Sequence, residues 1–337
     1  MNSQAHNTQT KDQHTKQEAQ KTIIAQKTII AMFDDIAKDY DKTNRILSLG
    51  IDISWRKDAV KRAYKARNTS EIERIVDVAC GSGDMIKHWH SYALESNIAL
   101  SEIIGIDPSQ EMLKIAEKKL LTKAQTPAQK VDSSSGDSVL SEQCGSVAKI
   151  AKGTNAEFAN LPQFSQSSHS PTANLRILEE HSQKLESKKV DSRIALQLGE
   201  AKDLSTLESQ SVDILSISYG LRNVLEYEQA LREFARVLKP GGIVVVLDFF
   251  KKSSPSLIDR IIGIYTKHIL PCIGYLISRN YAAYKYLPDS MEEFITPNEL
   301  TLALEKVGLQ PLEIKSYSAG ISHLVLGQKP CEEVGKG

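Results

Sequence analysis

The chain has 337 residues, and its 42 Lys and Arg side chains balance 42 Asp and Glu, so the formal net charge is zero. A protein that coats nucleic acid normally carries a basic excess, so this balance argues against that class. The four cysteines form no CxxC pair, which is typical of reduced thiols in a cytoplasmic protein rather than of disulfides or a zinc site.

The N-terminal residues 1–30 predict a disordered tail. Residues 1–20 are rich in Gln, Lys, Thr and Asn and offer almost nothing to bury, so we expect neither structure nor a signal peptide there. The unit 21–26 is nearly repeated at 27–32, which we interpret as a local duplication that lengthens a helix. Short amphipathic helices and a helix over 52–67 should follow.

From residue 75 onward, short apolar runs alternate with helical periodicity. This alternation predicts a parallel sheet with helices on both faces. The closing segments 312–318 and 321–328 are close enough to form an antiparallel hairpin at a sheet edge. The expected fold is therefore α/β and Rossmann-like, with a seven-stranded, mostly parallel sheet. The five parallel strands are predicted at 75–79, 102–107, 193–198, 212–218 and 243–249, and the helices among them at 84–93, 109–121 and 227–238.

Three stretches interrupt or close this pattern. Residues 122–190 are rich in Ser, Gln and Lys and too long for an ordinary connection, so we expect a low-complexity insertion, with a functional lid as the alternative. Lys239-Pro240-Gly241-Gly242 should stop the preceding helix. An apolar helical segment is expected over 256–286, and the charges and Pro271 within 257–277 exclude a spanning helix. One domain, interrupted by the insertion, is thus expected over 31–329, followed by a polar tail at 330–337.

The turn Gly81-Ser82-Gly83 after the first strand predicts a nucleotide-like ligand, because glycines let the backbone bend and a ligand approach. A dinucleotide fold wants a third glycine where this chain has Ile86. A P-loop is excluded, since no Gly-Lys-Ser/Thr follows. What remains is a nucleoside site without a pyrophosphate, with Asp77 on the first strand.

That set of residues suits S-adenosylmethionine. Asp107, at the end of the second strand, can accept hydrogen bonds from both ribose hydroxyls, while Asp77 and strand carbonyls can accept from the methionine ammonium. Glu200 and Ala201 would flank the adenine, and Ser218 faces the crevice where ligands bind in this architecture. Each of the two acids has a structural alternative: Asp77 could only cap the loop, and Asp107 could only be a turn residue.

Several separated motifs resemble the methyltransferases that C-methylate quinone precursors in menaquinone and ubiquinone biosynthesis. The most specific is Gly220-Leu221-Arg222-Asn223, and the resemblance covers about 30–122 and 190–329. It implies that Ser82, Asp107, Glu200, Ala201 and Ser218 contact S-adenosylmethionine. The insertion, and Asp203-Leu204-Ser205-Thr206 in place of the common Leu-Pro-Phe run, depart from the family pattern. The matching motifs lie at 32–41, 49–56, 77–84, 217–224, 268–274 and 284–290.

The resemblance implies demethylmenaquinol as the methyl acceptor. A ring carbon is a poor nucleophile until a neighbouring hydroxyl loses its proton, so the site must stabilise a phenolate. Arg222 supplies a permanent cation, Asn223 could orient the hydroxyl, Tyr219 could pack on the ring, and His268 is a candidate base. The structural alternatives are an ion pair that pins the loop for Arg222 and a satisfied helix histidine for His268.

The apolar residues between 257 and 287 suggest a lid for the polyprenyl tail, and their Lys and Arg neighbours suggest contact with the inner face of the membrane. We therefore expect a cytoplasmic, membrane-peripheral enzyme with a prenylated hydroquinone as its partner, no nucleic acid and no metal, and with a homodimer left open. Three alternatives remain: a methoxy-benzoquinol acceptor, a nicotinamide-dependent oxidoreductase and a non-catalytic binding module.

Overall fold

The computed structural model describes residues 2–123, 193–252, 263, 265 and 270–331. For residues 2–19, 121–123, 270 and 277–278 it describes the backbone alone. Several sequence predictions therefore lie outside the described residues: nearly all of the insertion at 122–190, His268, the apolar segment 256–286 before Leu270 except residues 263 and 265, and the polar tail beyond Cys331.

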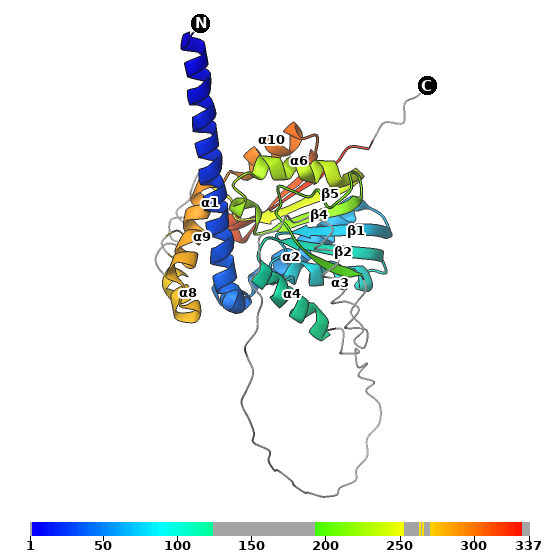
Figure 1. The fold of residues 1–337 in the computed structure, drawn as a ribbon. Helices are drawn as coiled ribbons and strands as arrows, with labels where there is room; N and C mark the ends of the chain where they lie inside the picture. The colour runs from blue at the N-terminus through cyan, green and yellow to red at the C-terminus, as the bar shows by residue number, and fades with distance from the viewer. Residues whose placement is uncertain (1, 124–192, 253–262, 264, 266–269, 332–337) are drawn as a thin grey trace, which may run out of the picture. The chain divides into compact units, whose positions relative to one another are not determined.

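A mixed sheet of seven strands confirms the predicted fold class (Figure 1). The strand order is β3-β2-β1-β4-β5-β7-β6, in which β1 to β5 run parallel and β7 runs antiparallel to both β5 and β6. The order reverses between β1 and β4, and in open α/β sheets ligands bind at such a switch point, outside the carboxyl ends of the strands. The strands are β1 Glu71–Val78, β2 Ala99–Asp107, β3 Ile194–Leu198, β4 Val212–Ser218, β5 Leu238–Asp248, β6 Gln310–Tyr317 and β7 Ser322–Gln328.

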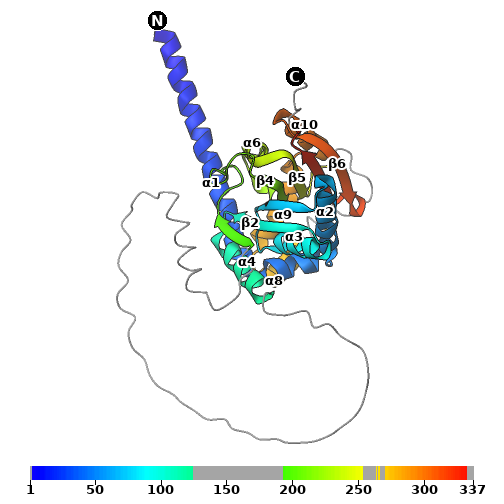
Figure 2. The ribbon, with the colours of Figure 1, turned by 90° about the vertical axis from the view of Figure 1, so that its right-hand side faces the viewer.

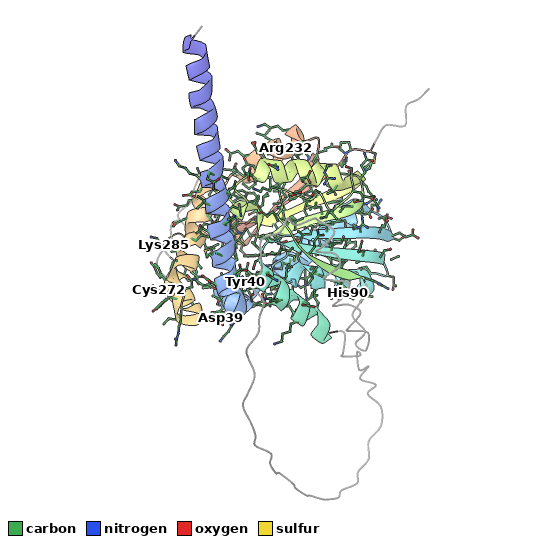
Figure 3. All side chains as sticks on the ribbon, viewed as in Figure 1. Asp39, Tyr40, His90, Arg232, Cys272 and Lys285 are labelled. Carbon is green, nitrogen blue, oxygen red and sulfur yellow. The ribbon has the colours of Figure 1, made fainter. Side chains whose placement is uncertain are left out.

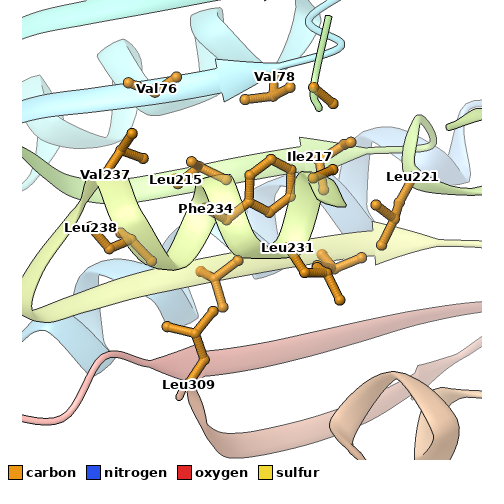
Figure 4. Close-up of a cluster of buried hydrophobic side chains, with 14 of the residues drawn as sticks. Val76, Val78, Leu215, Ile217, Leu221, Leu231, Phe234, Val237, Leu238 and Leu309 are labelled. Atoms are coloured by element: carbon orange, nitrogen blue, oxygen red, sulfur yellow. The ribbon is translucent and has the colours of Figure 1, made fainter. Parts of the chain in front are cut away.

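Helices cover both faces of the sheet (Figure 2). Phe234 of α6, labelled in Figure 4, and Leu300 of α10 pack on one face of the sheet, and Trp55 of α2 and Trp89 of α3 pack on the other. In the described part of the chain, no helix has an apolar stretch as long as a membrane span requires. The helices are α1 Asn2–Leu47, α2 Ile51–Arg67, α3 Asp84–Glu95, α4 Gln110–Lys123, α6 Tyr227–Val237, α8 Leu270–Ser278, α9 Tyr281–Glu293 and α10 Pro297–Lys306, with a short 3-10 helix η1 at Leu221–Asn223.

The N-terminal segment differs from its prediction. Instead of a tail over 1–30 followed by short helices, one helix, α1, runs from Asn2 to Leu47. Residues 2–47 contain neither glycine nor proline, so nothing in the backbone chemistry interrupts a helix once its C-terminal half is packed. That half packs against α8 and α9, with Ile36 beside Ala283 and Tyr284 (Figure 1).

The strand β5 also begins earlier than predicted, at Leu238 rather than Ile243. Leu238 pairs with Val212 of β4, and the next paired residues are Ile243 and Ile214, so β5 carries the extra residues as a bulge. Lys239-Pro240-Gly241-Gly242 therefore stops the helix as expected but forms an irregular part of the strand rather than a separate turn. Gly241 has a φ of 76°, which favours glycine.

Ile86, which stands where a dinucleotide fold would have its third glycine, packs against a glycine on the neighbouring strand. A Cβ added to Gly105 of β2 would lie 2.6 Å from Cδ1 of Ile86 and 2.8 Å from Cδ2 of Leu196. Ile86 is fully buried. Helix α3 thus approaches the sheet closely through a glycine on the strand instead of one on the helix.

We therefore expect Gly105→Ala to destabilise the fold by about 1–3 kcal/mol, the usual effect of overpacking a core. Chemical denaturation would measure the loss. Adding Ile86→Val, which removes the nearest carbon, should restore part of it, because the two residues share one contact. A full loss in the double variant would show that the clash lies elsewhere.

Candidate active site

A cavity lies at the carboxyl ends of the central parallel strands and is covered by α1, with about 700 Å³ free of protein atoms including its open mouth. The strand ends contribute a mixed polar and small-residue wall, and α1 contributes a largely apolar one. From the sheet side the lining residues include Ala79, Gly81, Asp107, Glu200, Ala201, Ser218 and Tyr219. From α1 they are Gln26, Ile29, Ile30, Phe33 and Tyr40.

Asp107 is held by two backbone groups on opposite sides of the cavity floor. Its carboxylate accepts hydrogen bonds from the N–H of Gly81 at 2.7 Å and from the N–H of Ser109 at 2.8 Å. Burial raises the pKa of Asp107 to about 6 although these two donors pull it down. The carboxylate is thus ionised at neutral pH, in a fixed orientation, with lone pairs left for ribose hydroxyls.

Ser218 carries a buried hydroxyl at the end of β4 that has no hydrogen-bond partner among the described residues. A buried polar atom without a partner is costly, so such an atom in a cavity wall indicates a ligand or ordered water. Gly81, with a φ of 52°, has no heavy atom within 4 Å of the position where a Cβ would stand, which leaves room for a close approach.

Ser82, Gly83 and Asp77, the other residues predicted to bind the cofactor, do not line the cavity. The Ser82 hydroxyl donates to Asp41 of α1 at 2.5 Å and accepts from Lys119 of α4 at 2.8 Å. A Cβ on Gly83 would lie 3.2 Å from Cβ of Ala116 in α4. In this structure Ser82 and Gly83 join the loop to α1 and α4. Contact of Ser82, Gly83 and Asp77 with the cofactor stays a prediction.

Asp77 is a buried carboxyl beneath the loop. Its Oδ1 accepts a hydrogen bond of 2.5 Å from Ser216, which in turn accepts one from Trp89, while its Oδ2 has no partner in the described chain. Burial raises the pKa of Asp77 to about 7, although Ser216 and the charge of Arg56 both lower it. Near neutral pH this carboxyl is therefore poised between its two forms, and a cation placed beside it would favour ionisation.

We expect the affinity for S-adenosylmethionine to fall about tenfold between pH 7 and pH 6, because only ionised Asp77 offers a negative charge to the methionine ammonium, and more steeply below pH 6, where Asp107 also takes up a proton. Titration calorimetry from pH 7.5 to pH 5.5 would measure this, in a range where the α-amino group stays protonated. Asp77→Asn should bind more weakly and remove the slope between pH 7.5 and 6.5. The same slope in both proteins would contradict the assignment.

The loop after β4 carries residues predicted to bind and activate the methyl acceptor. Tyr219 has a φ of 59°, and its ring lies 4.8 Å from the ring of Phe249, centroid to centroid. Asn223 donates to the carbonyl of Tyr219 and accepts from the hydroxyl of Tyr286 at 3.2 Å. Tyr219 and Asn223 both line the cavity, so two of the four predicted catalytic residues face the space beside the cofactor residues.

Arg222 lies behind this wall rather than in it. Its Nη1 donates to Asp248 at 2.5 Å and to the carbonyl of Tyr219 at 2.7 Å, and its side chain is 6% exposed. The ion pair that pins the loop, the structural alternative for Arg222, is thus present. Nε of Arg222 has no hydrogen-bond partner in the described residues, so the pair leaves one donor unused.

Sequence reasoning missed the contribution of α1 to the site. Gln26 donates to the carbonyl of Asn223 and accepts from the N–H of Leu225, and the partly buried Tyr40, labelled on α1 in Figure 3, lines the cavity. Asp34 of the same helix accepts from Ser109 at 2.5 Å. These contacts join residues far apart in the chain, and only the motif at 32–41 hinted at them.

The residues present fit S-adenosylmethionine. An ionised carboxylate is fixed where a ribose would lie, a buried hydroxyl lacks a partner, and a glycine leaves the floor open. Among the described residues, no three His, Cys, Asp or Glu side chains are placed to bind a metal ion together. The three described cysteines are free, with Cys272 exposed on α8 (Figure 3).

The chain matches the model of the ubiE/COQ5 methyltransferase family over residues 20–154 and 147–329. It is 36% identical to the ubiquinone/menaquinone biosynthesis C-methyltransferase UbiE of Campylobacter jejuni (strain 81116) over 304 residues, which are 90% of this chain and 98% of that one. It is 31% identical to the protein of that name from Syntrophotalea carbinolica, over 88% of this chain and 92% of that one. A solved S-adenosylmethionine-dependent methyltransferase from Thermotoga maritima matches with a TM-score of 0.47 and 16% identity, over 89% and 99% of the two chains.

The family match gives no support to an oxidoreductase, and it extends N-terminal to residue 31 as α1 does. The family model and the curated relatives lead to one conclusion: the chain belongs to the ubiE/COQ5 methyltransferase family, and its cavity residues fit S-adenosylmethionine as the methyl donor.

Proposed function

We propose that this protein methylates a ring carbon of demethylmenaquinol, and so completes a menaquinone. The observation that carries the proposal is the loop 219–223, whose Tyr219 and Asn223 form one wall of the cofactor cavity with the Arg222 cation directly behind. The printed names of the relatives, which cover both ubiquinone and menaquinone biosynthesis, support the quinol class.

When bound, S-adenosylmethionine supplies an electrophilic methyl group. The chain's own residues prepare the acceptor. Asn223, held by Tyr286 and by the carbonyl of Tyr219, orients a ring hydroxyl. The positive charge of Arg222, with its unused Nε, stabilises the phenolate that forms when this hydroxyl loses its proton. Burial raises the pKa of Tyr40 and of Tyr286, and the nearby charge of Arg222 opposes that rise in both.

The apolar wall from α1 suits a lipid-like acceptor. Ile29, Ile30 and Phe33 line the cavity, so the prenyl end of the quinol can leave between α1 and the loop. We further propose peripheral contact with a membrane through α8 and the start of α9, where Leu276 is 79% exposed and Tyr275 and Tyr281 about half exposed. His268 remains a proposed base on the strength of the family motif.

The quinones of a strain lacking this protein test the proposal. Accumulated demethylmenaquinone, removed when the gene is restored, is the expected result. Accumulation of an unmethylated methoxy-benzoquinone would instead favour the ubiquinone branch, and an unchanged quinone pool would refute both.

A further inference from the structure

A buried arginine on α2 lacks a good anionic partner. Arg56 is 8% exposed, and its Nε makes no hydrogen bond in the described structure. The closest carboxylate oxygen, on Asp52, lies 3.6 Å from Nε, beyond hydrogen-bond distance. Asp52 is already bound by Arg45 and by the hydroxyl of Ser48 at 2.7 Å. Arg56 thus has only a loose ion pair with Asp52, and a further anion beside this buried guanidinium would be stabilised.

Arg56 lies beside the cavity, next to the cofactor loop. Its guanidinium carbon is 4.7 Å from the centroid of the Tyr219 ring, and Tyr219 lines the cavity. Burial raises the pKa of Asp77, beneath the loop, and the charge of Arg56 opposes this rise; the same charge helps to lower the pKa of Asp84, which follows the loop. Arg56 is not itself a lining residue, but its guanidinium lies directly behind Tyr219, near the ends of β1 and β4.

The strand order assigns the parts of the cofactor to different strand ends. Glu200 and Ala201 follow β3, and Asp107 ends β2, so the adenine and ribose extend along one half of the crevice. In the order β3-β2-β1-β4, the remaining methionine half falls at β1 and β4. That is where Arg56 lies, and the α-carboxylate is the one anionic group of S-adenosylmethionine.

We propose that Arg56 binds the α-carboxylate of S-adenosylmethionine. The guanidinium offers a planar set of donors that matches a carboxylate, and the aromatic face of Tyr219 keeps it oriented. Asp77 then accepts the neighbouring ammonium, so the two charges of the amino acid end meet opposite charges. The inference concerns the cofactor alone and holds whichever quinol accepts the methyl group.

Decarboxylated S-adenosylmethionine, which lacks only this carboxylate, provides the test by titration calorimetry. The unaltered protein should bind it about 30-fold more weakly than S-adenosylmethionine. Arg56→Gln should lower the affinity for S-adenosylmethionine about 30-fold, while the affinity for the decarboxylated ligand should change less than about threefold. The two ligands should then bind the variant almost equally.

Arg62→Gln is the matched control, since Arg62 lies on the same helix but pairs with Asp58 and Glu313 instead of facing the cavity. It should change neither affinity. If Arg56→Gln does not fold, Arg56→Lys replaces it. This variant should bind S-adenosylmethionine severalfold more weakly and leave the affinity for the decarboxylated ligand unchanged. Equal weakening of both ligands, or equal binding of both by the unaltered protein, would overturn the assignment.

Discussion

Asp107→Asn is expected to weaken the binding of S-adenosylmethionine about 100-fold. The carboxylate accepts from the N–H groups of Gly81 and Ser109 through different oxygens, and an amide can accept from only one of them. The other N–H would face an amide NH₂, and the ribose would lose an anionic acceptor. Truncating a buried, charged hydrogen-bonding group typically costs about 2–5 kcal/mol of binding free energy. A 100-fold loss of affinity, about 2.7 kcal/mol, falls within this range. Titration calorimetry measures the change.

Asp213→Asn gives a matched control for this prediction. Asp213 is also a buried carboxylate that accepts from two backbone groups, the N–H of Glu73 and of Arg74, but it lies at the opposite end of β4. It also pairs with Arg67 and Lys239. This variant should be less stable to denaturant and bind S-adenosylmethionine normally. A similar loss of affinity in both variants would mean that the loss reflects general destabilisation.

Arg222→Ala is expected to lower the turnover number about 1,000-fold, the effect of removing a group that stabilises charge in the transition state. The affinity for S-adenosylmethionine should change little, because Arg222 does not line the cavity. The variant should also lose about 3–5 kcal/mol of stability, since Asp248, which is fully buried, would be left without its cation. Single-turnover kinetics and chemical denaturation at the same temperature separate the two effects.

Asp248→Asn distinguishes the two roles of Arg222, since it breaks the same ion pair but keeps the cation. If the charge itself stabilises the acceptor, this variant should keep a much larger share of turnover than Arg222→Ala. Equal losses in the two variants would show that Arg222 acts only by fixing the loop between Tyr219 and Asn223.

The central architecture could be predicted from the sequence because its signals are local. Apolar strands followed by glycines or acids gave the five parallel strands, and the spacing of Gly81, Asp107 and Ser218 placed three cavity residues correctly. The bulge in β5 could not be foreseen, because Pro240 and the two glycines after it indicate a turn whether or not the strand has begun.

The role of α1 escaped prediction for a different reason. Its N-terminal part is polar, and its value to the site comes from partners distant in sequence, such as Gln26 with Asn223 and Asp41 with Ser82. Arg56 escaped for the same reason, since an arginine on a helix usually faces solvent and only the tertiary fold buries it.

Methyl transfer by the purified protein tests the central claim most directly. The protein would be given S-adenosylmethionine with a deuterated methyl group and a chemically reduced, short-chain demethylmenaquinone. The account predicts a labelled methyl on the ring carbon, with S-adenosylhomocysteine formed in equal amount. Binding of S-adenosylmethionine without any transfer to the quinol, or a label on a hydroxyl oxygen, would contradict it.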